Sequence, residues 1–492
     1  MNFFTTRLKY RTSPISERIP KHKIQLLSQP NEKIKSRKEE QLLSLKRDRS
    51  LFANLYIACQ ARETDQEDFF KHENQPYPPS LSKFGQFKEG KKSDLIHCLE
   101  SQVAIDEDSA QVPHDNDMII LDGAAIVHRI KPGSIDTFGD YAAKFIDYIR
   151  EKCKGSVRRV DIMFDVYTSG SLKASTRSKR GKGTRRRVAE DKKIPSNWTD
   201  FLHDNHNKSQ LFAMIGNRVH REIFRGQVVI TSGSSVICSL DTDMANLAPC
   251  MHEEADTRIF IHAADGISNG LQHIVIRTVD TDVLVLAISY YNRLDCQDLW
   301  VAFGTGKSFR YINAKIIAQS LGPKKCKALP VFHAFSGCDT TSSFLGKGKR
   351  TAWATWNSFC AVTGAFCNIG QAPTHDTIRE ALPMLERFVI IMYDRGSTER
   401  DVNKARQIIF TQKARDIENI PLTQDALMQH TLRVSYQAGH IWGQCLLKDP
   451  PLPYPINFSW TWSESKKRVE SYVDVTAPNR HYLPCSFEVW VH

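Results

Sequence analysis

Seven acidic residues stand where the sequence predicts the end of a strand, the start of a helix or, for Asp339, a turn. One carboxylate at such a position is usually a helix cap or a turn residue. Several carboxylates at one edge of a sheet repel one another and raise one another's pKa unless cations lie among them. Mg²⁺ or Mn²⁺ suits carboxylate and water ligands, so the set predicts a site for two such ions. The residues are Asp122, Asp165, Glu254, Asp256, Asp280, Asp282 and Asp339.

Two of these acids lie in an apolar stretch, RTVDTDVLVL (277–286). We expect this stretch to be the second part of a buried strand, HIVIRTVDTDVLVL (273–286). On an extended strand, Asp280 and Asp282 would face the same way, because residues two apart share a face. Burying a carboxylate is costly unless a partner offsets its charge, so this pair needs a partner.

Apolar strands alternate with helical segments between residues 117 and 304. The alternation predicts an α/β fold in which helices flank a central, mostly parallel, twisted sheet. In open sheets of this kind, function gathers at the carboxyl ends of the strands, where most of the acids are expected. The expected strands are 117–123, 158–165, 226–232, 273–286 and 298–304, and the expected helices are 141–153 and 255–266.

Changes in composition divide the chain into three regions. Residues 1–113 are predicted to be a basic N-terminal extension and linker, with a short helix at 93–102. Residues 114–360 form the predicted α/β domain. Residues 361–492 are expected to be mostly helical and to end in a tail rich in Pro and Trp. The α/β domain thus carries helical extensions at both ends.

The chain of 492 residues has a net charge of +12 and a sequence pI of about 9.0. This balance favours nucleic acid as a partner, with charge for solubility alone as the alternative. No two of the 12 cysteines are spaced C-x-x-C, which argues for reduced thiols and against a structural zinc site. No apolar run reaches the ~18 residues of a membrane span, so we expect no membrane partner. We expect an intracellular, nuclear protein, with a mitochondrial location as the alternative because the N-terminus is basic and poor in acids.

The order and flanks of the acids resemble the flap-endonuclease and PIN-like nuclease superfamily. The matching motifs are an early strand-end acid (Asp122), FDV in place of F-D-G (164–166), EAD (254–256), D-x-D (280–282) and G-x-D (337–339). The chain also resembles a poorly characterised group of large animal proteins that carry HEEADTR, TVDTD and HAFSGCDT-type motifs. The resemblance implies a PIN-like domain whose seven acids hold two ions of Mg²⁺ or Mn²⁺ at the rim of the sheet.

The resemblance also implies roles for basic residues. In flap endonucleases a Lys and an Arg that follow the second acid reach the scissile phosphate, and Lys173 and Arg180 match them approximately. Residues 173–187 hold eight Lys or Arg and no acids, which suits nucleic-acid binding or, alternatively, a nuclear import signal. A glycine hairpin that grips the duplex backbone is implied at 346–349, with an ordinary glycine turn as the alternative. The further nucleic-acid-binding candidates are Arg177, Lys179, Arg185, Arg186, Arg187, Gly346, Lys347, Gly348 and Lys349.

The segment FGTGKS (303–308) resembles part of an ATP-binding P-loop. That motif requires a glycine at position 301, where this chain has Val301. We therefore expect no ATP site, and we interpret the glycines as a turn after the strand 298–304.

Together these features predict a divalent-metal-dependent nuclease that hydrolyses phosphodiester bonds of DNA or RNA by a two-metal mechanism. Two alternatives remain open. One is a catalytically inactive nucleic-acid-binding scaffold that keeps the fold and the basic face. The other is a domesticated mobile-element protein. His252 and His333 lie near acid motifs, but a lone histidine is usually structural, and we assign neither a role.

Overall fold

The computed structural model describes residues 66–73, 77–83, 86–103, 113, 115–168, 171–173, 183–411, 419–463 and 468–471, together with five residues between 53 and 60. The elements below belong to these residues. Arg180, predicted to act on the scissile phosphate, lies outside them, as do the predicted nucleic-acid contacts Arg177 and Lys179.

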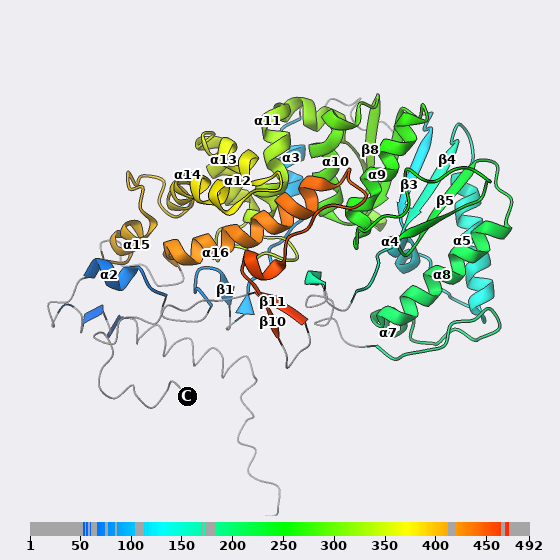
Figure 1. The fold of residues 1–492 in the computed structure, drawn as a ribbon, viewed down its shortest axis with the longest axis horizontal. Coiled ribbons are helices and arrows are strands. Elements are labelled where there is room, and N and C mark those ends of the chain that lie inside the picture. Colours follow the sequence, from blue (N-terminus) through cyan, green and yellow to red (C-terminus); the bar gives the residue numbers. More distant parts are fainter. Residues whose placement is uncertain are drawn as a thin grey trace, which may run out of the picture. The chain divides into compact units, whose positions relative to one another are not determined.

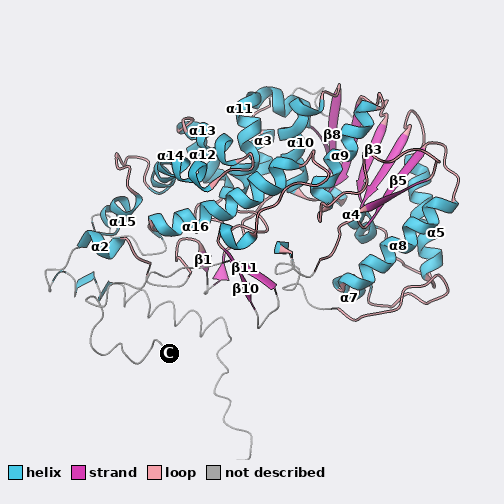
Figure 2. Cartoon of the chain, viewed as in Figure 1, coloured by secondary structure: helices cyan, strands magenta, loops and turns pink. Residues whose placement is uncertain are grey.

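Seven strands form the central sheet in the order β6-β5-β4-β3-β7-β8-β9. The five inner strands are parallel, and β6 and β9 pair antiparallel at the two edges. The prediction of an α/β fold with a mostly parallel sheet is therefore confirmed (Figure 2). The strands are β3 (Met118–Asp122), β4 (Arg159–Met163), β5 (Gln227–Ser232), β6 (Ser235–Cys238), β7 (His273–Thr278), β8 (Asp298–Phe303) and β9 (Arg310–Asn313).

Helices cover both faces of the sheet (Figure 1). On one face, α5 and α8 bury a cluster that includes Phe145 and Ile162. On the other face, α9, α10 and α11 bury the main core, which includes Ile120 and Val301. The expected helices at 141–153 and 255–266 are present as α5 and α9. The helices of this part are α4 (Gly123–Arg129), α5 (Phe138–Lys152), α7 (Trp198–His203), α8 (Asn205–Arg221), α9 (Ala255–Ser268), α10 (Thr281–Leu294) and α11 (Ala314–Phe335).

The C-terminal part is mostly helical, as expected, and it shares the main core with the sheet. That core runs from Phe69 to Trp460 and crosses the boundary that the sequence suggested at residue 360. No described helix combines the length and the apolar character that a membrane crossing requires. The helices are α12 (Lys349–Ser358), α13 (Val362–Ile369), α14 (His375–Tyr393), α15 (Val402–Thr411) and α16 (Gln424–Val434), which continues into a π-helical turn (Ser435–Ile441).

Short elements from the predicted N-terminal extension join the same core. The short helix expected at 93–102 is present as α3 (Asp94–Glu100), and it buries Leu95 and Leu99. An antiparallel pair of two-residue strands precedes it, and a second antiparallel pair of strands follows the C-terminal helices. These elements are α2 (Gln66–Phe70), β1 (Ser82–Lys83), β2 (Gln86–Phe87), β10 (Trp460–Ser463) and β11 (Arg468–Ser471).

The strand expected at 273–286 is wrong in its second half. The strand β7 ends at Thr278, and α10 begins at Thr281. Periodicity does not distinguish a buried strand from a buried helix in so short an apolar run. Asp280 favours the helix, because its side chain accepts a hydrogen bond from the backbone N of Asp282 and caps the first turn. The strand expected at 158–165 is also shorter, since β4 ends at Met163.

A buried charge network connects the centre of the sheet to α9. The Arg159 guanidinium donates to both carboxylate oxygens of Asp161 at 2.7 Å and to Asp265 at 2.6 Å. Nδ1 of His262 lies 2.6 Å from the Asp161 Oδ2. Burial alone would raise the pKa of Asp161, but Arg159 and His262 outweigh burial and hold that pKa below its usual value. The carboxylate therefore stays charged in the core because its partners are fixed there.

We predict that Asp161→Ala lowers the free energy of unfolding by about 3–5 kcal/mol, because it leaves the Arg159 guanidinium buried without its main partner. Urea denaturation measures the change. The exposed Asp147→Ala, on α5, serves as the control and should stay within about 0.5 kcal/mol of the wild type. Equal unfolding midpoints for Asp161→Ala and the wild type would contradict the role given to the network.

Candidate metal centre

Two helices begin at the carboxyl edge of the sheet with an aspartate as cap. The Asp122 Oδ1 accepts a hydrogen bond from the backbone N of Ala125 at 3.0 Å, at the start of α4. The Asp280 Oδ1 accepts from the backbone N of Asp282 at 2.9 Å, at the start of α10. The helix N-terminus favours a negative charge at both positions. Thr278 connects them, since its hydroxyl donates to the Asp122 Oδ2 at 3.3 Å and accepts from the Asp280 backbone N at 3.0 Å.

The third helix, α9, starts with two more acids and is capped from a distance. Its own N-cap residue, Glu254, makes no side-chain capping bond. Instead, the Asp165 Oδ1 accepts from the backbone N of Ala255 at 2.9 Å. Asp165 lies in the segment that follows β4, so this bond joins the second acid motif to the third. Glu254 and Asp256 are thereby placed beside the ends of β3 and β7.

Two glycines are required where the backbone turns near the acids. A Cβ atom on Gly123 would lie 2.4 Å from the Phe164 ring, so the Asp122-Gly123 turn leaves no room for a side chain. Gly337 has a φ of +106°, and a Cβ there would lie 2.6 Å from the Ser343 side chain. The Gly in the G-x-D motif therefore fixes the approach of the loop that carries Asp339.

Six of the seven predicted acids line one cleft of about 660 Å³ at this edge. Lys173, the first predicted catalytic residue, lines it as well. The six acids are Asp122, Asp165, Glu254, Asp256, Asp280 and Asp339.

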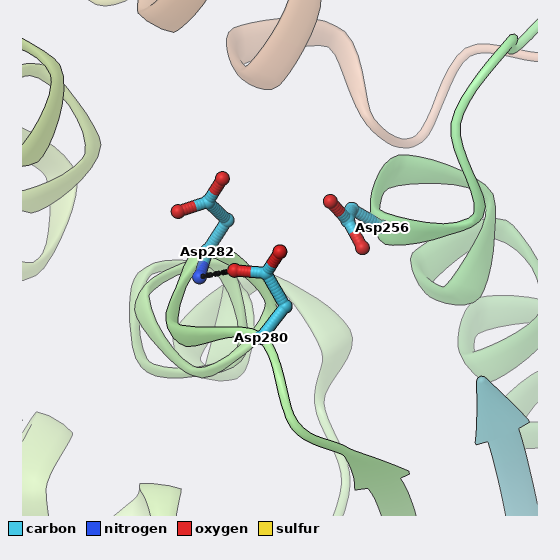
Figure 3. Close-up of side chains that lie close together, drawn as sticks. All are labelled: Asp256, Asp280 and Asp282. Atoms are coloured by element: carbon cyan, nitrogen blue, oxygen red, sulfur yellow. Dashed lines mark hydrogen bonds between the residues drawn. The ribbon is translucent and has the colours of Figure 1, made fainter. Parts of the chain in front are cut away.

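Asp282, the seventh acid, is buried beneath the cleft lining and lies close to two of the other acids. Asp256, Asp280 and Asp282 each offer a carboxylate oxygen, and these three oxygens lie within 4.8 Å of one another. Figure 3 shows Asp256 pointing from the start of α9 toward Asp280 and Asp282 at the start of α10. The Asp282 side chain is 1% exposed. No described residue hydrogen-bonds to its buried Oδ2.

Two lysines pair with the acids. The Lys173 Nζ lies 2.8 Å from the Glu254 Oε2 and 3.2 Å from the Asp256 Oδ2. A second ammonium, that of Lys92, lies about 3 Å from a carboxylate oxygen of each of three acids: Asp280 (2.9 Å), Asp282 (3.1 Å) and Asp339 (3.0 Å). Burial alone would lower the pKa of Lys92, but the three carboxylates outweigh burial and raise it.

The carboxylates differ in how well these lysines compensate them. Burial, together with the neighbouring charges of Asp165 and Asp280, raises the pKa of Asp122 to about 7. Burial likewise raises the pKa of Glu254 to about 7 despite Lys173, and it raises the pKa of Asp256. The pKa of Asp282 is lowered instead, because Lys92 and a hydrogen bond from His333 outweigh its burial. The site thus carries more negative charge than its lysines offset.

His333 holds Asp282 from inside the protein. Its Nε2 donates to the Asp282 Oδ1 at 2.8 Å, and burial lowers the pKa of His333 to about 4, so the ring is neutral. Behind it, Lys349 is 1% exposed and donates to the His333 carbonyl oxygen and to the Ser336 Oγ. This placement corrects the sequence prediction for Lys349, because a lysine enclosed by protein has no access to a phosphate backbone.

The donor set fits a hard divalent cation. The carboxylates of Asp256, Asp280 and Asp282 converge, and one buried oxygen of Asp282 has no hydrogen-bond partner among the described residues. The neighbouring acids Asp122 and Glu254 have raised pKa values. Carboxylate oxygens are the ligands that such ions prefer. Asp256, Asp280 and Asp282 could therefore hold a metal ion.

The other predicted nucleic-acid contacts are not among the described lining of the acid cleft. Arg185, Arg186 and Arg187 are exposed and precede α7. Gly346 has a φ of +69° in a tight turn closed by a bridge between Phe344 and Lys347, and Gly348 precedes α12. Neither this turn nor the arginines belong to the described lining of the acid cleft.

Sequence reasoning missed Lys92 and gave His333 no role. Lys92 belongs to the predicted N-terminal extension, and nothing in its local sequence distinguishes it from Lys91. His333 stands near the G-x-D motif, but its spacing from Asp282 in sequence carries no signal.

The turn predicted for 303–308 is present, with Gly304 at a φ of +83° and a 3-10 turn at Gly306–Ser308.

Comparison with known proteins adds no assignment: the sequence matches no protein-family model, and it matches no curated protein significantly.

We predict that Mn²⁺ raises the melting temperature of the wild type and that Asp280→Asn with Asp282→Asn abolishes this rise. An ion at 100 times its dissociation constant stabilises the fold by about 2.7 kcal/mol. Asn also caps helices, so the double variant should fold. Asp295→Asn, at the other end of α10, is the matched control. An equal Mn²⁺ response in the double variant would place the ion elsewhere.

We further predict that Lys92→Met lowers the free energy of unfolding in EDTA by about 3–5 kcal/mol, because three carboxylates lose their shared ammonium. Mn²⁺ should then stabilise this variant more than it stabilises the wild type, since the ion no longer competes with Lys92. The measurement is urea denaturation with EDTA and with Mn²⁺. Lys91→Met, next to it and largely exposed, is the control. A Lys92→Met protein as stable as the wild type in EDTA would refute the bridging role.

Proposed function

We propose that the protein is a divalent-metal-dependent nuclease of the PIN-like type, which hydrolyses phosphodiester bonds of DNA or RNA. One observation carries the proposal: the cleft at the carboxyl edge of the parallel sheet gathers six widely separated acids together with Lys173. Helix caps alone do not require this convergence. The acids come from five motifs spread from residue 122 to residue 339.

The charge balance supports two ions of Mg²⁺ or Mn²⁺. The seven carboxylates exceed the two ammonium groups of Lys92 and Lys173 by five charges when all are ionised. Two divalent ions would offset four of them. Bound there, such ions supply water activation and a clamp on the attacking and leaving oxygens. Asp256, Asp280 and Asp282 would hold one ion, and the remaining cleft acids would contribute to the second.

The chain's own residues would position the substrate. Lys173 lies at the cleft surface, where its ammonium can turn from Glu254 and Asp256 to a phosphate oxygen and offset charge that develops there. His128, Lys131 and Lys208 line the same cleft and supply basic groups near the acids. Acids that could hold metal ions, next to basic residues that could contact phosphates, form a lining compatible with a phosphate backbone.

A nucleic-acid partner also follows from the overall charge. The net charge of +12 favours a polyanion, and the exposed arginines at 185–187 would add backbone contacts.

The second candidate function is a nucleic-acid-binding scaffold without catalysis. The observation that favours it is the position of Lys92, whose ammonium already pairs with three of the acids. If ions cannot displace or accompany this ammonium, the acids are a structural network and the basic groups of the cleft still bind nucleic acid.

We predict that the purified protein cleaves DNA or RNA with Mg²⁺ or Mn²⁺ and that EDTA stops cleavage. Asp280→Asn with Asp282→Asn should reduce the rate by about a hundredfold or more, because even partners outside the ligand shell contribute 10–100-fold at metal sites. The substrates are a 5′-flap, a plain duplex, single-stranded DNA and single-stranded RNA. Asp295→Asn is the control. Tight binding without cleavage, equal in wild type and double variant, would favour the scaffold.

A further inference from the structure

A second cavity, of about 520 Å³, lies on the sheet beside the acid cleft. Side chains of the inner strands β3, β7 and β8 form its apolar floor, among them Leu121, Val275 and Ala302. Arg129 and Thr305 line both this cavity and the acid cleft, so the two spaces are neighbours. A volume of this size is typical of a small-molecule site.

Three basic side chains line this second cavity: Arg129, Lys152 and Arg277. Within the described chain, none of them forms an ion pair with a carboxylate. Burial lowers the pKa of Lys152, and the charges of Arg129 and Arg277 lower it further. Three cations that face one space with no carboxylate in direct ion-pair contact repel one another. An anion that entered this space would relieve the repulsion.

Arg277, which lines the cavity, and Tyr148, which contacts its lining residue Lys152, carry buried polar atoms without hydrogen-bond partners among the described residues. Arg277 is 6% exposed, and it donates to the carbonyl oxygens of Thr278, Ala302 and Gly304. These bonds fix its guanidinium, yet its Nε has no hydrogen-bond partner among the described residues. The buried hydroxyl of Tyr148 has none either, and the Lys152 Nζ lies 5.3 Å from the Tyr148 ring centroid.

An aromatic pair stands at the edge of this group. Phe309 is 40% exposed, and its ring centroid lies 5.3 Å from that of Tyr311. The Arg277 guanidinium carbon lies 5.1 Å from the Phe309 centroid, so charge and ring occupy the same wall. An exposed ring beside cations is the combination on which nucleobases stack while their phosphates are held.

We propose that this second cavity binds one nucleotide, with its phosphate at Arg129 and Lys152 and its base against Phe309 and Tyr311. Phosphate, ribose and base match the basic, polar and aromatic parts of the lining. The nucleotide is either free or part of a strand. If it is part of a strand, the shared wall at Arg129 makes it a neighbour of the phosphodiester in the acid cleft, and this last step rests on the proposed function.

The test is calorimetric titration of the full-length protein with AMP in EDTA, compared with inorganic phosphate. Lys152→Met and Phe309→Ala should each weaken AMP binding by about tenfold, through a lost charged hydrogen bond and a lost stacking surface respectively. Lys154→Met removes the same charge two residues away at an exposed position and should leave the affinity unchanged. A melting curve for each variant shows that it is folded.

The outcomes separate the ligand sources. Competition of AMP with a 5′-phosphorylated single-stranded oligonucleotide, with the oligonucleotide binding more tightly, supports a strand as the source. Binding of AMP alone supports a free nucleotide. Three results would each overturn the proposal. The first is no AMP binding by the wild type, and the second is an AMP affinity in Lys152→Met equal to that of the wild type. The third is inorganic phosphate binding as tightly as AMP, with no effect of Phe309→Ala. Because these titrations contain no metal, absence of cleavage activity does not bear on them.

Discussion

The structure of the carboxyl edge depends on electrostatic repulsion among seven carboxylates that the fold brings together. Three helix N-termini, one threonine hydroxyl and two lysines offset part of that repulsion. The remainder appears as raised pKa values at Asp122, Glu254 and Asp256. A site in this condition has a strong electrostatic preference for added cations, and this preference connects the fold to the proposed chemistry.

Residues from distant segments offset part of this repulsion. Lys92, which pairs with Asp282, lies just before α3. His333, which donates to Asp282, lies on α11, and α11 packs along α10 in the main core. Because one core joins the N-terminal elements, the sheet and the C-terminal helices, Lys92 completes the site from outside the expected α/β domain. The second cavity shows the opposite imbalance, with three cations and no paired carboxylate among the described residues. Neighbouring spaces of opposite charge suit a ligand that carries phosphates and binds metal.

Sequence reasoning worked where a short pattern has one physical meaning. The alternation of apolar strands and amphipathic helices was sufficient for the parallel sheet, and each acid motif lay at the expected edge. It failed at 279–286, because a run such as VLVL suits a buried helix as well as a buried strand and the deciding feature is the cap at Asp280. It also failed at Lys349. The sequence suggests a glycine-lysine turn that contacts phosphate, but the Lys349 side chain is buried in the folded chain.

The sequence by itself determined which carboxylates exist, their order along the chain and the sheet that carries them, because these follow from local periodicity and from capping. Only the tertiary structure decided that Lys92 neutralises Asp280, Asp282 and Asp339, that His333 orients Asp282, and that Arg129, Lys152 and Arg277 share one cavity. Those contacts join residues tens to hundreds of positions apart. They arise from burial in a common core, and the sequence between the partners records no spacing that would predict them.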